Sequence, residues 1–230
     1  MKLRLAVIVG LSLIYSIAMS QESEVYIKGG LNIANVTTNS SGAIENANAL
    51  ASFHVGVMGD LPLGKYLAVQ PALLFTGKGA KTESGSSANP TYFTATSSPY
   101  YIELPVNLVL KLPLANEGSG LFVGAGPYIA MGVAGKNKSE GKIFGVPFES
   151  DKSIDFSNDD PTTGTEEGAG FGIMRRFDYG VNATAGLLLN NLLIGLNYGI
   201  GLAKLQSGAD NSDDDNNKHR VFSLSLGFRL

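Results

Sequence analysis

The sequence lacks cysteine and tryptophan, and its 230 residues include only two histidines, His54 and His219. Without cysteine the chain can form no disulfide framework, no cysteine-ligated zinc site and no thiol nucleophile. Charged residues make up 16% of the chain, well below the ~25% of an average soluble domain. The formal net charge of −3 argues against a nucleic-acid-binding protein, because such a protein needs a basic surface to neutralise phosphates.

Long hydrophobic runs are also missing, apart from one near the N-terminus. Two basic residues among the first four precede an almost wholly apolar segment, residues 5–17, and small residues follow over 18–20. This order is typical of a secretory signal peptide, and the apolar run is shorter than the ~20 residues that a membrane anchor needs. The sequence therefore predicts a signal peptide over residues 1–20, cleaved before Gln21, and one β-barrel domain over residues 21–230.

Most of the remaining chain alternates between apolar and polar residues. Between Tyr100 and Lys111, for example, every second residue is apolar, while Glu103 and Asn107 belong to the other set. A β-strand places such alternating sets on opposite faces. The pattern predicts eight strands, at residues 25–33, 53–61, 67–78, 100–111, 121–133, 176–187, 192–202 and 222–230.

The connections between these strands alternate strictly in length. The short ones lie at residues 62–65, 113–120 and 190–191, and the long, polar ones at 36–51, 79–98, 134–174 and 206–217. Outer-membrane barrels have this asymmetry, with short periplasmic turns and longer extracellular loops. The predicted fold is therefore an all-β, eight-stranded antiparallel up-and-down transmembrane barrel.

A membrane barrel must be closed and must point its apolar face outward, because hydrocarbon cannot satisfy unpaired backbone groups. The polar face then points inward, and it carries Lys28, His54, Gln70, Lys78, Glu103, Lys111, Arg176, Asp178 and Arg229. A soluble barrel such as a lipocalin would have the opposite arrangement. The loop asymmetry, the signal peptide and the apolar row of the C-terminal strand favour the membrane barrel.

Six segments of the chain can be compared with a known family: Leu73–Lys81, Tyr101–Pro105, Gly126–Tyr128, Phe177–Gly180, Leu196–Gly199 and Arg220–Phe228. In order and spacing they resemble the PorT-like outer-membrane β-barrel family, across essentially the whole mature chain. The resemblance implies an eight-stranded barrel of the OmpA and OmpX kind, whose C-terminal strand serves as the assembly signal. Such barrels usually end in an aromatic residue, whereas this chain ends in Leu230, with Phe228 on the same face.

The inward polar residues could line a pore or form a packed interior. Eight strands enclose a space that side chains can fill, and buried charges need partners. We therefore expect a plug, formed by a network of charged side chains: Glu103, Lys111, Arg176, Asp178 and Arg229.

Two long loops contain candidate binding segments. Asp210–Asn217 could hold calcium through its oxygen atoms, but it lacks the central glycine and terminal glutamate of an EF-hand loop, so we expect a solvated acidic hairpin tip. The loop at 134–174 is the longest and mixes acidic residues with phenylalanines. Because loops of this length are often functional, it is the first choice for contact with an extracellular partner.

Catalysis is not expected. His54 shares a strand face with Asp60, but the two would lie about 20 Å apart, and no Gly-x-Ser-x-Gly elbow is present. We expect no catalytic, cofactor-binding or metal-binding residues, and no cofactor.

The function expected is that of a non-enzymatic outer-membrane barrel of a Gram-negative bacterium, acting as a structural, adhesion or interaction scaffold. A small channel and a barrel-hosted hydrolase are the alternatives. The expected partners are outer-membrane lipid, the barrel assembly machinery through the C-terminal strand, and an extracellular partner of loop 134–174, with no nucleic acid.

Overall fold

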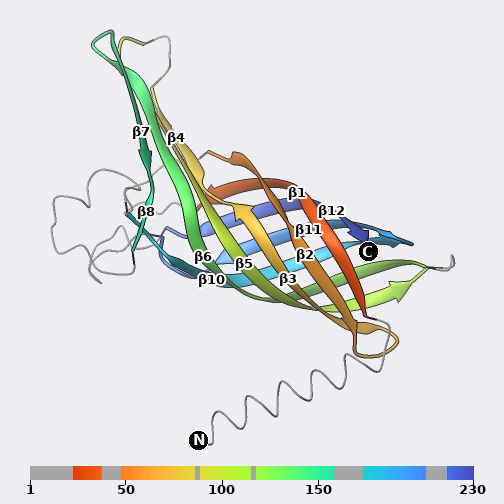
Figure 1. Cartoon of the computed structure of the whole chain (residues 1–230). Coiled ribbons are helices and arrows are strands. Elements are labelled where there is room, and N and C mark those ends of the chain that lie inside the picture. Colours follow the sequence, from red (N-terminus) through yellow and green to blue (C-terminus); the bar gives the residue numbers. More distant parts are fainter. Residues whose placement is uncertain (1–22, 38–47, 86–88, 115–117, 158–172, 206–216) are drawn as a thin grey trace, which may run out of the picture.

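Eight long strands form a closed antiparallel ring in the computed structural model, which describes residues 23–37, 48–85, 89–114, 118–157, 173–205 and 217–230 (Figure 1). Strand β5 pairs with both β3 and β6, and β12 pairs with β1, so the ring has no open edge. In order around the ring the strands are β1 (Glu24–Val36), β2 (Leu50–Pro62), β3 (Leu67–Gly77), β5 (Tyr92–Pro113), β6 (Ser119–Ile143), β10 (Phe177–Leu189), β11 (Leu192–Gly201) and β12 (His219–Arg229).

The eight strands and the three short connections predicted from the sequence are confirmed. The connections join β2 to β3, β5 to β6 and β10 to β11 at one end of the barrel. The tightest is Asn190-Asn191, where Asn190 has a φ of 53°. Asparagine tolerates this left-handed conformation better than most residues, which suits it to a two-residue turn.

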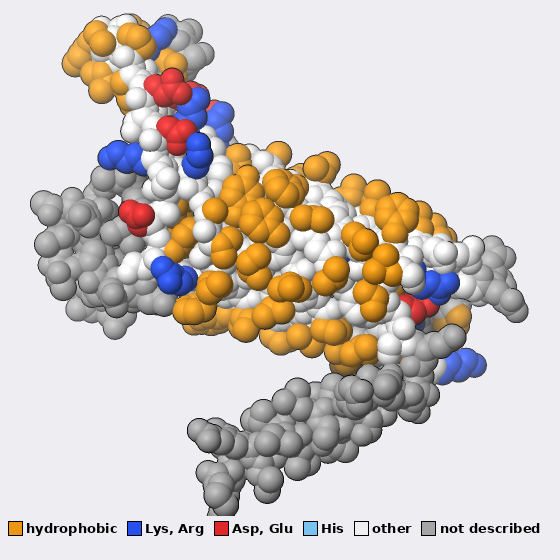
Figure 2. Space-filling view, in the orientation of Figure 1, with side chains coloured by type: hydrophobic (Ala, Val, Ile, Leu, Met, Phe, Trp, Pro, Cys, Tyr) orange, Lys and Arg blue, Asp and Glu red, His pale blue; other side chains and the backbone are white. Residues whose placement is uncertain are grey.

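The predicted facing of the strands is also confirmed. On β12, Leu224 and Leu226 are each 46% exposed, whereas Ser225 between them is completely buried. The same alternation around the ring covers the outer wall with apolar side chains, which form the broad hydrophobic belt in Figure 2. The inward face carries the buried polar and charged side chains, among them Lys28, His54 and Asp178, so the barrel has the reverse arrangement of a soluble one.

The regions expected as loops at 79–98 and 134–174 contain further strands, which corrects the prediction. They hold β4 (Ala80–Ser84), the first residues of β5, the last residues of β6, β7 (Val146–Ser153), β8 (Asp155–Ser157) and β9 (Ile173–Arg175). Strands β4, β5, β6 and β7 pair in that order as a sheet that continues beyond the barrel rim (Figure 1). We call it the projecting sheet. Much of the surface of the projecting sheet is exposed. Because neither of its faces meets lipid, its sequence lacks the alternation of apolar and polar residues that identified the barrel strands.

A register shift at Tyr100 and Tyr101 separates the barrel part of β5 from its part in the projecting sheet. Such an irregularity bends a strand, and it occurs where β5 and β6 leave the ring. The other long connections fall largely outside the described residues, and so do residues 1–20 and all of the acidic segment Asp210–Asn217 except Asn217. No helix in the described ranges is long and apolar enough to cross a bilayer.

Candidate functional site

An apolar cluster fills the barrel interior at the end with the short turns. It contains Tyr26, Met58, Ala68, Val109, Phe122 and Leu193, all of them buried. The ring of Phe122 extends over β10, where a β-carbon on Gly186 would lie only 2.6 Å from its Cζ atom. Glycine at this position therefore makes room for the aromatic ring that fills the lumen.

His54 is the centre of a hydrogen-bonded network above this cluster. Its Nδ1 lies 2.8 Å from Oδ1 of Asn32, and its Nε2 lies 2.9 Å from the Ser225 hydroxyl. Asn32 uses its amide group to donate to the hydroxyl of Thr76 at 2.9 Å and to the carbonyl of Gly77. Because the amide oxygen of Asn32 is thus left to accept, His54 donates from Nδ1 and accepts the Ser225 proton at Nε2.

The strand register explains how these side chains meet. Gly30 is directly opposite His54 on β2 and directly opposite Ser225 on β12. With no side chain at position 30, His54 can lie across β1 and reach Ser225. A β-carbon on Gly30 would come within 2.8 Å of the His54 ring.

The serine, histidine and asparagine have the order of a nucleophile, a base and an orienting group. Ser225, however, is completely buried, and its hydroxyl oxygen also accepts a hydrogen bond of 3.0 Å from the Asn197 amide. The His54–Asp60 combination considered from the sequence does not form, since Asp60 binds Gln70 at 2.9 Å and Lys111 at 2.6 Å. The arrangement around His54 therefore acts as part of a packed core.

Lys78 joins two carboxylates nearer the long-loop end of the lumen. Its Nζ atom lies 2.8 Å from Glu103 and 2.7 Å from Asp178, and all three side chains are buried. The Tyr128 hydroxyl donates to Asp178 at 3.1 Å, and the Lys78 ammonium lies 4.3 Å from the Tyr128 ring centre. We call these four residues the Lys78 centre. Two carboxylates around one ammonium, with a phenol donor and an aromatic face, give each buried charge a partner.

The prediction of a charged network is therefore wrong about which residues form it. Glu103 and Asp178 are joined by Lys78 rather than by arginines. Lys111 pairs with Asp60 at the short-turn end of the barrel. Arg176 and Arg229 are exposed at opposite strand ends, where Arg176 donates to the Phe156 carbonyl at 2.9 Å and Arg229 pairs with Glu24. Neither arginine reaches the interior network.

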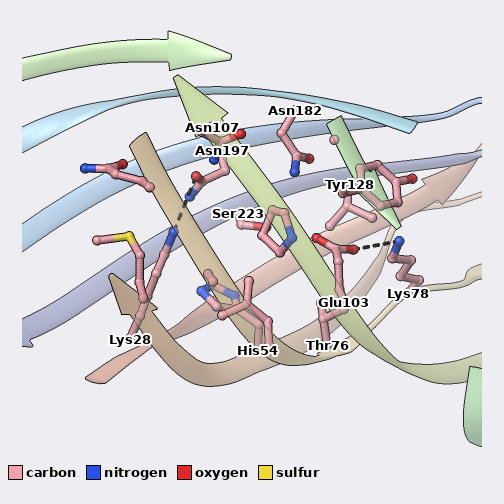
Figure 3. Close-up of a pocket in the computed structure, with 17 residues that line it drawn as sticks. Lys28, His54, Thr76, Lys78, Glu103, Asn107, Tyr128, Asn182, Asn197 and Ser223 are labelled. Carbon is pink, nitrogen blue, oxygen red and sulfur yellow. Dashed lines mark hydrogen bonds and ion pairs between the residues drawn. The ribbon is translucent and has the colours of Figure 1, made fainter. Parts of the chain in front are cut away.

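A cavity of about 50 Å³ lies between the His54 network and the Lys78 centre. Figure 3 shows Lys28 on one side, where it donates to Asn197 at 3.5 Å, and the Lys78–Glu103 pair on the other, with His54 between them. The space is large enough for a few water molecules. A polar pocket of this size between packed layers is not an open pore.

A second apolar cluster covers the lumen at the long-loop end. It is formed by Val36, Ala80, Ile154, Met174 and Leu205, with Phe156 packed against it. Phe156 also meets the Tyr101 ring edge-on at 5.8 Å. In the described part of the chain, the lumen is thus closed by apolar side chains at both ends.

The projecting sheet exposes much of its surface, and almost all of β7 is exposed. On its surface Lys138 pairs with Glu140 at 3.0 Å and with Glu149 at 3.1 Å. Hydrogen bonds to Glu140 and to Glu149 raise the pKa of the Lys138 ammonium. Towards the tip, Phe93 on β5 stacks against Phe148 on β7, with ring centres 6.2 Å apart. Within the described residues, no group of three or more histidine or acidic side chains is arranged to hold a metal ion.

The sequence and the fold can be compared with those of known proteins. Residues 19–207 match the family model described as an outer membrane protein beta-barrel domain. The chain belongs to this family. It is therefore an integral β-barrel protein of the outer membrane of a Gram-negative bacterium. Barrels of this kind have short periplasmic turns and longer extracellular loops.

Solved outer-membrane barrels are similar at low identity. Ail, the attachment invasion locus protein of Yersinia pestis, is 15% identical with a TM-score of 0.40, and the match covers 91% of this chain and all of Ail. Neisserial surface protein A is 12% identical over the same shares, with a TM-score of 0.41. OprG from Pseudomonas aeruginosa is 9% identical, with a TM-score of 0.41 over 91% of this chain and 97% of OprG. No curated protein sequence matches the chain.

Proposed function

We propose that this outer-membrane barrel is a non-enzymatic scaffold that acts outside the cell through its projecting sheet and the surrounding 134–174 region. The observation that carries the proposal is the contrast between the two parts of the molecule. Inside, apolar clusters close the lumen and the polar groups bind one another. Outside, β4, β5, β6 and β7 extend past the rim and expose much of their surface.

The test is a shortened variant in which residues 136–153 are replaced by Asn-Gly. This turn would join Gly135 to Ile154, whose backbone groups already share a hydrogen bond of 3.0 Å. The variant should still migrate faster on gels before heating than after, as a folded barrel does. Cells that display it should lose retention on immobilised lipid, polysaccharide or protein surfaces to which cells with the full-length protein adhere. Equal retention of both cell types would refute the scaffold proposal.

Measuring conductance in planar bilayers distinguishes the scaffold proposal from the channel alternative. The scaffold proposal predicts no stepwise conductance from the full-length protein, because both ends of the lumen carry apolar clusters. Regular ion-conducting steps from the folded barrel would favour the channel. The hydrolase alternative requires esterase or lipase activity that disappears in His54→Ala, which retains the ring of strands.

We also propose the finer assignments that the sequence supports. Residues 1–20 serve as a signal peptide, and the C-terminal strand, with Phe228 exposed on its outer face, is the segment that the assembly machinery recognises. The six segments that resemble the PorT-like family support membership of that branch. Loop 134–174 is the contact region for an extracellular partner, and its described part contains the end of β6 and all of β7, two of the four strands of the projecting sheet.

A further inference from the structure

The tip of the projecting sheet is a strained turn that holds a phenylalanine in water. Strands β6 and β7 are joined by Phe144 and Gly145, with φ angles of 51° and 84°. Glycine adopts such angles freely, and asparagine is the usual residue at the first position of this turn. A bulky side chain there is a genuine outlier. Strain of this kind is found where function requires it.

The side chains around this turn leave an unusual amount of apolar surface exposed. Phe144 is 90% exposed, Val146 67% and Ile143 54%. Phe144 and Val146 are more exposed than the outward side chains of the barrel strands, which reach 66% at Leu31, and Ile143 lies within the range of those side chains. We call the three residues the apolar tip. These side chains lie at a two-residue turn at the end of the sheet, so they project outward and form no groove. To leave water they must therefore enter an apolar environment themselves.

The residues next to the apolar tip have the character of a membrane interface. Lys142 directly precedes it, with its ammonium 5.9 Å from the centre of the Tyr92 ring. The stacked rings of Phe93 and Phe148 lie just below. Aromatic rings and lysines with apolar stems favour the boundary between acyl chains and headgroups. The ionic ladder of Lys138 with its two glutamates follows further down the sheet.

The apolar tip is separate from the belt that faces the protein's own membrane. Val133 is the last outward apolar residue of β6 before the sheet's polar stretch, and Phe144 comes eleven residues later. At ~3.3 Å per residue the strand between them spans about 36 Å. Figure 2 shows the two apolar surfaces with charged side chains between them. The tip is therefore placed to meet a surface other than the bilayer around the barrel.

We propose that the apolar tip inserts into an opposing phospholipid bilayer, with Phe144 among the acyl chains and Lys142 at the headgroups. This inference rests on the proposed scaffold function and names the surface that the scaffold binds. The single lysine beside the tip predicts stronger binding to vesicles that contain anionic phosphatidylglycerol than to vesicles of pure phosphatidylcholine.

The absence of tryptophan from the chain makes a direct test available. Phe144→Trp places a single fluorescent indole at the tip of the full-length barrel, held in nanodiscs. Adding phosphatidylcholine–phosphatidylglycerol vesicles should shift the emission to shorter wavelength. Acyl-brominated lipid should quench it when present in the added vesicles and not when present in the nanodisc. Quenching from the nanodisc alone would overturn the proposal, because the tip would then lie in its own bilayer.

Phe144→Asn is the matched variant, since asparagine suits the turn while removing the apolar ring. It should fold at least as well as the original protein but bind vesicles at least about tenfold more weakly, as expected from the loss of one buried phenylalanine. Unchanged vesicle binding would refute insertion of Phe144. A loss of cell retention with no vesicle binding by either protein would instead indicate a protein partner and would also overturn the proposal.

Failure of this inference is distinguishable from failure of the scaffold proposal. If replacing residues 136–153 abolishes cell retention while Phe144→Asn has no effect, the scaffold remains and the lipid contact is wrong. If the replacement itself leaves retention unchanged, the scaffold proposal fails.

Discussion

Replacing Lys78 by methionine removes the only cation of the Lys78 centre and leaves Glu103 and Asp178 together in the sealed lumen. Lys78 is 2% exposed, and the two carboxylate residues are 9% and 5% exposed. Breaking a buried ion pair by removing one partner costs roughly 3–5 kcal/mol, because the remaining charge is left uncompensated. Lys78→Met should therefore lower the free energy of unfolding by about 4 kcal/mol, or almost a thousandfold in the folding equilibrium constant.

The assay is urea unfolding of the barrel in phospholipid vesicles, followed by its heat-modifiable gel band. Lys81→Met is the control, because the exposed Lys81–Glu83 pair should contribute below about 1 kcal/mol. The triple variant Lys78→Met, Glu103→Gln and Asp178→Asn should recover most of the loss, since it leaves no buried charge. If Lys78→Met costs no more than Lys81→Met, water reaches the centre and the lumen is not sealed.

Three other predictions follow from the same structure. Leu224→Arg should impair folding into vesicles by about 2–4 kcal/mol, because it places a charge on the lipid face; a silent substitution would mean that the facing is inverted. Gly30→Ala should cost about 1–3 kcal/mol by overpacking against the Leu224 carbonyl and the His54 ring, as measured by urea unfolding, and a stability equal to the original protein would contradict the close packing described at Gly30. Mass spectrometry of the protein from outer membranes should find an N-terminus at Gln21, and a retained Met1 would rule out the signal peptide.

The fold could be predicted because the strands of a membrane barrel alternate between lipid-facing and lumen-facing residues, which gives the sequence a period of two. Every second residue of Tyr100–Lys111 is apolar, and Phe222–Leu230 alternates throughout, since one face meets lipid and the other meets the lumen. The projecting sheet has no such contrast. Stretches such as Lys136–Lys142 carry polar residues on consecutive positions, so pattern alone assigned them to a loop.

The partners inside the lumen could not be predicted, because they depend on how the strands are staggered around the ring. Periodicity identified Lys78, Glu103 and Asp178 as inward-facing, but their sequence separations say nothing of their heights in the barrel. Arg176 and Arg229 share that inward phase, yet they lie at opposite strand ends, where their side chains are exposed to solvent. The meeting of His54 with Ser225 requires Gly30 between them, a relation visible only in the β1 register.

The apolar tip has a sequence signal, but this signal is too short for periodicity to detect. A Phe-Gly pair between polar strands is a turn in which asparagine would be the ordinary first residue. Its meaning depends on exposure and φ, which only the three-dimensional structure supplies.

The central claim is a closed barrel with lipid outside and a sealed interior, and a cysteine scan of β12 tests it most directly. The chain has no cysteine of its own, so single cysteines from Val221 to Phe228 can each carry a spin label in vesicles. Labels at 222, 224, 226 and 228 should be accessible to oxygen dissolved in lipid, and those at 221, 223, 225 and 227 should be shielded from oxygen and from a water-soluble nickel reagent alike. Nickel access at 223 and 225 would contradict the sealed interior, and an inverted oxygen pattern would contradict the barrel's facing.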